Sequence, residues 1–192
     1  MREIIAEGVR KSYNGVAVLR GVSFRADESR PACFMAPSGG GKTTLFRILM
    51  GLEAPDAGNI VLPERCRWSA AFQEDRLLLG RDARYNLRFA LGKDYREAEA
   101  SALLETLGLG DVGKKPVREY SGGMRRRLSL IRALLKPSDA LILDEPFTGI
   151  DLEVRARCLD AARRYGAGRI TLLATHTLSD AEALDAQVIS LR

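Results

Sequence analysis

The chain has 192 residues, 46% of them hydrophobic and 29% charged, which is typical of a folded globular domain and excludes a disordered chain. No apolar run reaches the length of a membrane span, and residues 1–9 carry charges too early for a signal peptide, so neither is expected. The net charge of +5 favours neither nucleic acid nor an anionic membrane surface over the other. Cys33, Cys66 and Cys158 are widely spaced and are expected to be buried free thiols.

The first 26 residues alternate between apolar and polar side chains, a pattern that predicts β-strands. Asn14-Gly15 interrupts this pattern and is a strong hairpin signal. We therefore expect a small antiparallel β lobe over residues 1–30. Tyr13 lies at the hairpin turn, where its ring can stack on an adenine base or simply pack on the sheet.

The most informative stretch runs from Ala36 to Thr44 and reads APSGGGKTT. It matches the phosphate-binding loop pattern GxxxxGK[ST], except that alanine replaces the first glycine. An apolar run at 32–35 predicts a buried strand before it, and residues 45–50 predict a helix after it. The alternative is a glycine-rich turn with an incidental lysine. The residues expected to bind a nucleoside triphosphate are Ser38, Gly39, Gly40, Gly41, Lys42, Thr43 and Thr44.

Each residue type in this loop has a chemical reason. Glycines expose the backbone N–H groups, and the N-terminus of the following helix attracts phosphate. Lys42 would reach the β and γ phosphates, and the Thr43 hydroxyl would bind Mg²⁺.

Beyond this loop, residues 60–62 and 68–72 predict two further strands. The hydrophobic period then becomes helical from Ala83 to Leu109, and glycines end that stretch. Residues 74–122 are therefore expected to form a helical insert in an α/β chain.

A second glycine-rich helix start is predicted at Ser121-Gly122-Gly123. Ser121 is a good N-cap, and the two glycines leave backbone N–H groups exposed to an anion. The alternative is a capped helix after a flexible turn. The triplet at 125–127, three arginines, falls on different helix faces and is expected to be a solvated surface rather than a nucleic-acid stripe.

Two carboxylates, Asp144 and Glu145, end an apolar run that begins at Ala140. Such a run predicts a strand buried on both faces of a parallel sheet, and ligands of these sheets bind beyond the carboxyl ends of the strands. Asp144 can hold Mg²⁺, and Glu145 can orient or deprotonate an attacking water. The alternative is a strand that ends in solvated acids.

The only histidine, His176, follows another apolar strand, 169–174. This strand is expected to end at the same edge of the sheet as the strands before the phosphate loop and before Asp144. The His176 imidazole can contact a γ-phosphate there. The alternative is a histidine on a surface loop. A helix at 152–164, a short helix at 179–184 and a strand at 186–191 complete the expected elements.

Together these motifs resemble the ATP-binding subunit of ABC transporters over nearly the whole chain. The family has, in order, a stacking aromatic, Walker A, a glutamine loop, a signature, Walker B, a D-loop and a switch histidine. They read here as Tyr13, Ala36 to Thr44, Gln73, Ser121-Gly122-Gly123, Asp144-Glu145, Thr148-Gly149-Ile150-Asp151 and His176. The signature is highly specific because Arg127 and Arg132-Ala133-Leu134 follow it, although Tyr120 and Met124 replace the usual leucine and glutamine.

The resemblance implies a P-loop NTPase core with a mainly parallel sheet. One domain, 1–192, would contain the β lobe at 1–30, the core at 31–73 and 123–192, and the insert at 74–122. It also implies a Mg²⁺-dependent ATPase whose two subunits pair head to tail around ATP. The signature residues Ser121, Gly122 and Gly123 are implied to bind the ATP held by the other subunit. Asp151 of the D-loop is also implied to bind ATP.

Glu145, His176 and Gln73 are implied to act in hydrolysis, and Gln73 also to approach Mg²⁺. The implied partners are a second ATPase subunit, expected to be identical, a membrane permease, and indirectly a solute-binding protein. No nucleic acid is expected, and the implied location is the cytoplasmic face of the cell membrane.

The run from Gln73 to Leu78 resembles the glutamine loop of nitrate, sulfonate and taurine importer ATPases, although Gly80-Arg81 departs from it. Residues 77–79 are three leucines, which either bury against a permease helix or pack inside the insert. Two other classes stay open: a non-transport ATPase of the same superfamily, and a module that uses ATP only to dimerise. Glu145 argues against the last.

Overall fold

The computed structural model describes residues 2–37, 39–112 and 114–191. Its strands are β1 (Glu3–Tyr13), β2 (Val16–Asp27), β3 (Ala32–Met35), β4 (Ala57–Val61), β5 (Trp68–Ala71), β6 (Ala140–Asp144), β7 (Ile170–Ala174) and β8 (Gln187–Ser190). Its α-helices are α1 (Lys42–Leu49), α2 (Ala83–Leu91), α3 (Glu97–Thr106), α4 (Gly122–Leu135), α5 (Leu152–Gly166) and α6 (Leu178–Ala183). Short 3-10 turns lie at Gly92–Asp94, Gly110–Val112 and Val117–Glu119.

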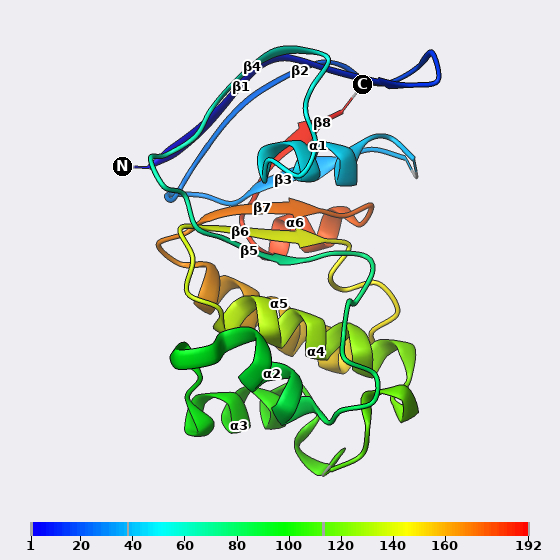
Figure 1. Ribbon diagram of the computed structural model, residues 1–192, viewed down its shortest axis with the longest axis vertical. Helices are drawn as coiled ribbons and strands as arrows, with labels where there is room; N and C mark the ends of the chain where they lie inside the picture. The colour runs from blue at the N-terminus through cyan, green and yellow to red at the C-terminus, as the bar shows by residue number, and fades with distance from the viewer. Residues whose placement is uncertain (1, 38, 113, 192) are drawn as a thin grey trace.

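A parallel five-stranded sheet of order β5-β6-β7-β3-β8 forms the centre of the molecule. An antiparallel three-stranded sheet of order β2-β1-β4 covers one side, and α1 lies between the two sheets (Figure 1). Helices α4 and α5 cover the other side, with α2 and α3 outside them (Figure 1). The predicted α/β class, with a β lobe and a helical insert, is confirmed.

Strand β6 shows why the parallel sheet is buried on both faces. Ala140 and Ile142 point into the core shared with α1 and the small sheet, whereas Leu141 and Leu143 point into the core shared with the helices. All five residues of β6 are buried, and so are all five of β7. Side chains alternate between the faces of a strand, so an all-apolar strand requires a cover on each side.

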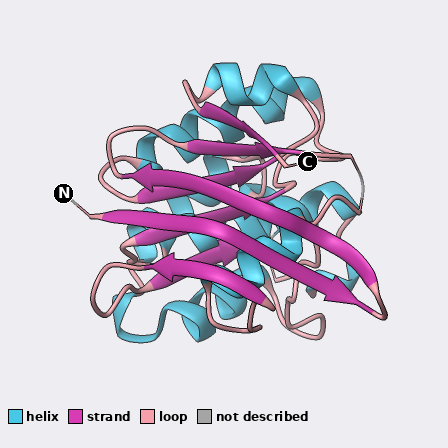
Figure 2. Cartoon of the chain, turned by 90° about the horizontal axis from the view of Figure 1, so that it is seen from above, coloured by secondary structure: helices cyan, strands magenta, loops and turns pink. Residues whose placement is uncertain are grey.

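The small sheet begins with the predicted hairpin. Asn14 and Gly15 both have positive φ, 49° and 79°, as a two-residue turn of type I′ requires. The two long strands of the hairpin cross over the parallel sheet when the molecule is seen from above (Figure 2). The hairpin therefore covers the hydrophobic core that contains α1.

The small sheet has a third strand, β4, which lies outside the β lobe expected at residues 1–30. β4 pairs with β1 in the antiparallel sense, with Val61 opposite Ile5 and Asn59 opposite Glu7. Gly58 lies so close to β1 that a Cβ atom there would be 2.6 Å from the Gly8 carbonyl. Pairing between segments so far apart in the sequence leaves no local signal, so the periodicity of each segment alone could not reveal it.

The helical insert contains α2, α3 and the 3-10 turns. Asp82 caps α2 by accepting a hydrogen bond from the Tyr85 N–H at 2.7 Å. Gly108, just after α3, has φ 68°, the left-handed conformation that commonly ends a helix. In the part of the chain that the structure describes, no helix has the length and apolar character needed to cross a membrane.

The free cysteines differ in exposure. Cys33 and Cys158 are buried as expected, whereas Cys66 is partly exposed. Burial raises the pKa of the Cys33 and Cys158 thiols to about 11, so both are protonated at neutral pH.

Candidate active site

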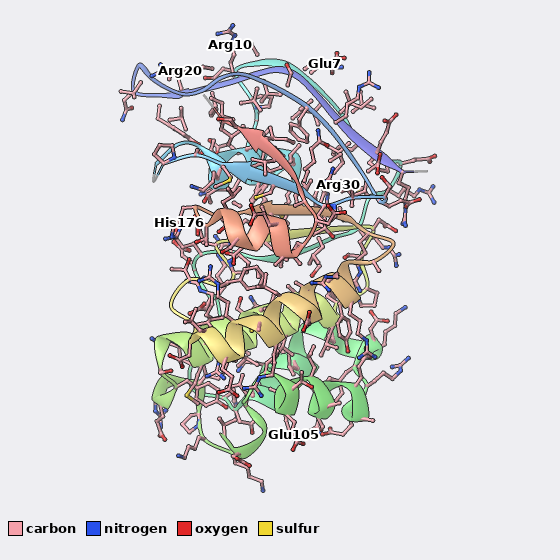
Figure 3. All side chains as sticks on the ribbon, turned by 180° about the vertical axis from the view of Figure 1, so that it is seen from behind. Glu7, Arg10, Arg20, Arg30, Glu105 and His176 are labelled. Atoms are coloured by element: carbon pink, nitrogen blue, oxygen red, sulfur yellow. The ribbon has the colours of Figure 1, made fainter. Side chains whose placement is uncertain are left out.

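A cavity of about 480 Å³ lies where β3, β5, β6 and β7 end. It gathers most of the predicted site residues from four separate segments of the chain. Its lining residues are Gly39, Gly40, Gly41, Lys42, Thr43, Thr44, Gln73, Arg126, Asp144, Glu145, Thr148 and His176. Ser38, also predicted to bind phosphate, lies outside the described residues. Figure 3 shows His176 at this edge of the parallel sheet.

The glycines of the phosphate loop are required by close contacts. Gly41 has φ 86° and is the N-cap of α1, and a Cβ atom there would be 2.6 Å from Leu19 Cδ2. A Cβ atom on Gly40 would be 2.6 Å from the Cβ of Ala36. Ala36, which departs from the usual pattern, therefore fits because its methyl group occupies the space that Gly40 leaves free.

Lys42 is almost completely buried, with 8% of its surface exposed. Its ammonium group donates hydrogen bonds to the Ala36 carbonyl at 2.8 Å and the Pro37 carbonyl at 3.4 Å. It also lies 3.6 Å from Glu145 Oε1. The cation is thus held over the loop, where phosphate oxygens can replace the two carbonyls.

Thr43 and Asp144 form the candidate metal site. The Thr43 hydroxyl donates to Asp144 Oδ2 at 2.5 Å, while Asp144 Oδ1 is buried without a hydrogen-bond partner. Burial raises the pKa of the Asp144 carboxyl, the bond from Thr43 opposes this rise, and the charge of Glu145 adds to it. A buried, unpartnered carboxylate oxygen beside a hydroxyl fits Mg²⁺, which prefers oxygen ligands.

Among the residues that the structure describes, no cluster of three or more His, Cys, Asp or Glu side chains is placed to hold a metal ion.

Glu145 follows β6 in an unusual backbone conformation. Its φ is 50°, in the left-handed region that non-glycine residues rarely adopt, and its N–H donates to the Ala174 carbonyl at 2.9 Å. Its Oε2 lies 2.9 Å from His176 Nδ1 and accepts a bond from the Thr148 hydroxyl at 3.2 Å. Backbone strain of this kind is characteristic of functional sites.

The loop that carries His176 is fixed by a partly buried ion pair. Arg155 donates two hydrogen bonds to Asp180 Oδ1, at 3.0 and 2.8 Å, and one to Oδ2 at 2.8 Å. The Thr175 hydroxyl donates to Asp180 Oδ2 at 3.0 Å. Sequence reasoning missed Arg155 and Asp180, although an acid just inside a short helix after His176 was an available signal.

Gln73 lines the cavity, and arginines of α4 hold its loop. Arg126 Nη1 donates to the Phe72 carbonyl at 3.0 Å and to the Gln73 carbonyl at 2.6 Å. Arg127 Nη1 donates to the Leu107 carbonyl at 2.6 Å. The prediction that residues 125–127 form a solvated surface is wrong: these side chains are partly buried because carbonyl groups of distant loops lie against α4.

The remaining predicted residues lie outside this cavity. The Tyr13 hydroxyl donates to the Glu53 carboxylate, and the ring is 42% exposed. Ser121 caps α4 as predicted, accepting a bond from the Met124 N–H at 3.2 Å. A Cβ atom on Gly122 would meet no atom within 4 Å, so the approach to this backbone is open. Asp151 is exposed at the start of α5.

The loop that contains Asp151 packs on the signature of the same chain. A Cβ atom on Gly123 would be 2.9 Å from the Gly149 carbonyl, so only glycine fits there without displacement of the backbone. The signature and D-loop segments thus form one continuous surface beside the cavity.

A glycine loop between β3 and α1, with acidic residues at the end of β6, defines a nucleotide-binding protein of the P-loop class. The sequence pattern of the family described as ABC transporter matches residues 19–148. The chain belongs to the ABC transporter family, in which it corresponds to the ATP-binding part.

The chain is similar to ATP-binding proteins whose names refer to drug resistance, to export and to import. It is 38% identical to the daunorubicin resistance ATP-binding protein DrrA3 of Streptomyces coeruleorubidus, over 94% of this chain and 62% of that protein. It is 38% identical to the Nod factor export ATP-binding protein I of Paraburkholderia xenovorans, over 92% and 63%. It is 36% identical to the aliphatic sulfonates import ATP-binding protein SsuB 1 of Nocardia farcinica, over 96% and 76%.

The chain spans about three fifths of the length of the first two relatives. A solved structure of a bacterial Atm1-family ABC exporter with ATP bound has the same fold, with a TM-score of 0.83 at 23% identity, over 100% of this chain and 37% of that one. The resemblance to ABC transporter ATP-binding subunits is confirmed. Importer and exporter relatives match with similar identity, so the importer-like glutamine loop does not separate the chain from exporters.

Proposed function

We propose that the chain binds ATP with Mg²⁺ and hydrolyses ATP to energise transport through a membrane permease. The observation that carries the proposal is the position of Glu145. Its carboxylate lies between Lys42, at 3.6 Å, and His176, at 2.9 Å, in the cavity that also contains Thr43 and Asp144. A carboxylate held beside a phosphate-binding lysine is placed to act on a water that attacks the γ-phosphate.

Each residue has a separate part in this mechanism. Lys42 exchanges its two carbonyl acceptors for phosphate oxygens. Thr43 and Asp144 would hold Mg²⁺, which supplies positive charge to the phosphate oxygens when bound. Glu145 orients the water and accepts its proton, and His176 contacts the γ-phosphate from the end of β7. Gln73 approaches the same site from its loop.

The proposed active form is a head-to-tail dimer of two copies. Ser121, Gly122 and Gly123 lie outside the cavity, so in the proposal they serve ATP bound to the other copy. Leu152, next to Asp151, is 83% exposed, and Leu178, near His176, is 51% exposed. Apolar side chains this exposed beside the site are consistent with a surface that a second copy covers.

The permease is proposed to dock on a groove of about 410 Å³ between the core and the insert. Leu77 packs against the helical core, whereas Leu78 and Leu79 are 39% and 52% exposed, so packing inside the insert accounts only for the first of the three leucines. The apolar residues that line the groove include Met50, Trp68, Phe72, Leu78 and Phe89. In this proposal the insert, 74–122, moves as a unit relative to the core, and the chain works at the cytoplasmic face of the membrane.

The test is hydrolysis by the purified chain. Wild type should release phosphate from ATP only with Mg²⁺, and Glu145→Gln should keep ATP binding and lose turnover, because an amide cannot accept the proton. Full activity of Glu145→Gln, or no ATP binding by wild type, refutes the proposal. Co-purification with a permease separates a transporter from a non-transport ATPase of the same family.

A further inference from the structure

Arg126 connects three functional segments. It lies on α4, which begins at the signature, and its side chain is only 15% exposed. It lines the nucleotide cavity, and its Nη1 atom donates to the carbonyls of Phe72 and Gln73. The guanidinium group thus lies between the signature helix, the cavity and the glutamine loop.

The glutamine loop depends on such contacts because it has no regular structure of its own. Residues 72–79 belong to no helix or strand. Arg132, farther along α4, donates to the carbonyls of Asp75 at 2.9 Å and Arg76 at 2.6 Å. Asp75 Oδ1 lies 3.6 Å from Arg126 Nη1. Hydrogen bonds from charged donors are stronger than neutral ones. The two arginines therefore fix four of the five carbonyls from Phe72 to Arg76, all but that of Glu74.

We propose that Arg126 is a positioning residue that holds Gln73 at the cavity, so that the glutamine loop follows the movement of the signature helix. The inference rests on the proposed ATPase function. Because its hydrogen bonds go to the carbonyls of Phe72 and Gln73, Arg126 is inferred to act through the backbone of the glutamine loop. Its removal should therefore slow hydrolysis without removing the phosphate loop that binds ATP.

The experiment compares Arg126→Gln, Gln73→Ala and the double variant in the full chain. Arg126→Gln should lower kcat about tenfold and change ATP affinity, measured with a fluorescent ATP analogue, by less than about twofold. Because Arg126 acts through Gln73, the double variant should be no slower than Gln73→Ala alone. Hydrogen exchange in residues 73–79, measured by mass spectrometry, should be faster in Arg126→Gln than in wild type.

Arg127→Gln is the matched control because it removes guanidinium–carbonyl bonds of the same helix that go to Leu107, Gly108 and Gly123 and not to the glutamine loop. Equal loss of kcat in this control, independent losses in the double variant, or unchanged exchange in 73–79 overturns the proposal. A wild type that does not hydrolyse ATP refutes the proposed function instead, and the exchange of 73–79 then still decides whether Arg126 holds the loop.

Discussion

At the scale of single residues, the backbone of the phosphate loop surrounds Lys42. The ammonium group is buried and binds two carbonyls of the loop that it serves. An ion removed from water is stable only when charged or polar partners surround it, and here the loop backbone supplies them. In the proposed function, ATP would therefore replace the existing carbonyl partners of Lys42.

Lys42→Ala should abolish ATPase activity and weaken ATP binding at least about tenfold, because no other side chain of the described loop carries positive charge to the phosphates. The measurement is phosphate release together with ATP affinity. Lys115→Ala, at an exposed lysine, is the control and should match wild type. Wild-type turnover in Lys42→Ala would contradict the assignment of the loop.

His176→Ala should lower kcat at least about tenfold while ATP affinity stays within about threefold, since the ring contacts Glu145 and is proposed to contact the γ-phosphate. The side chain is 63% exposed, so its loss should leave the fold intact. Turnover at saturating ATP should be compared with binding of ATP. Weaker binding with unchanged turnover would be evidence against this role.

At the scale of elements, the sequence predicts the strands and helices well and their partners poorly. The strand at 140–144 and the helix capped by Ser121 are local patterns of hydrophobicity and capping, and both were predictable. Two other features depend on contacts between segments that are distant in the sequence. They are the pairing of β4 with β1 and the hydrogen bond from Arg126 to the Gln73 carbonyl. The positive φ of Glu145 is set by its turn against β7, which no neighbour in the sequence specifies.

In the candidate site, too, features set by local sequence could be predicted and those set by distant contacts could not. Lys42, Thr43 and Asp144 could be predicted because a motif fixes their chemistry and spacing. An acid just inside the short helix after His176 was a signal for Asp180, but its partner Arg155 could not be assigned without the packing of α5 on α6. Their ion pair forms only once both helices are in place.

The glutamine loop and insert should provide the docking surface. Leu78→Glu and Leu79→Glu should abolish association with the permease and leave the basal ATPase of the isolated chain unchanged, because both side chains point into solvent and not into the core. Val188→Glu, at an apolar residue 47% exposed on β8, is the control and should bind normally. Unfolding of the substituted chains, or normal permease binding, would show that the docking assignment is wrong.

At the scale of the whole molecule, ATP should bring two copies together. Glu145→Gln with ATP and Mg²⁺ should elute from size-exclusion chromatography as a dimer, because bound ATP is no longer consumed. Gly122→Asp added to Glu145→Gln should remain a monomer that still binds ATP. Space around Gly122 is open within one copy, so the new carboxylate harms only the contact with the other copy's phosphates.

An ATP-bound monomer of Glu145→Gln would contradict head-to-tail pairing. A dimer that persists in the double variant would place the signature away from the interface.

The order of the parallel sheet also governs when this site can form during synthesis on a ribosome. β3, which leads into the phosphate loop, has β7 and β8 as its two neighbours. Residues 32–35 are translated long before residues 170–190. The backbone N–H and C=O groups of β3 therefore have no strand partner while the middle of the chain is synthesised. The ability to bind ATP should therefore arise in one late step, and a nascent chain stalled before residue 170 should have none, even though its complete phosphate loop has left the ribosome.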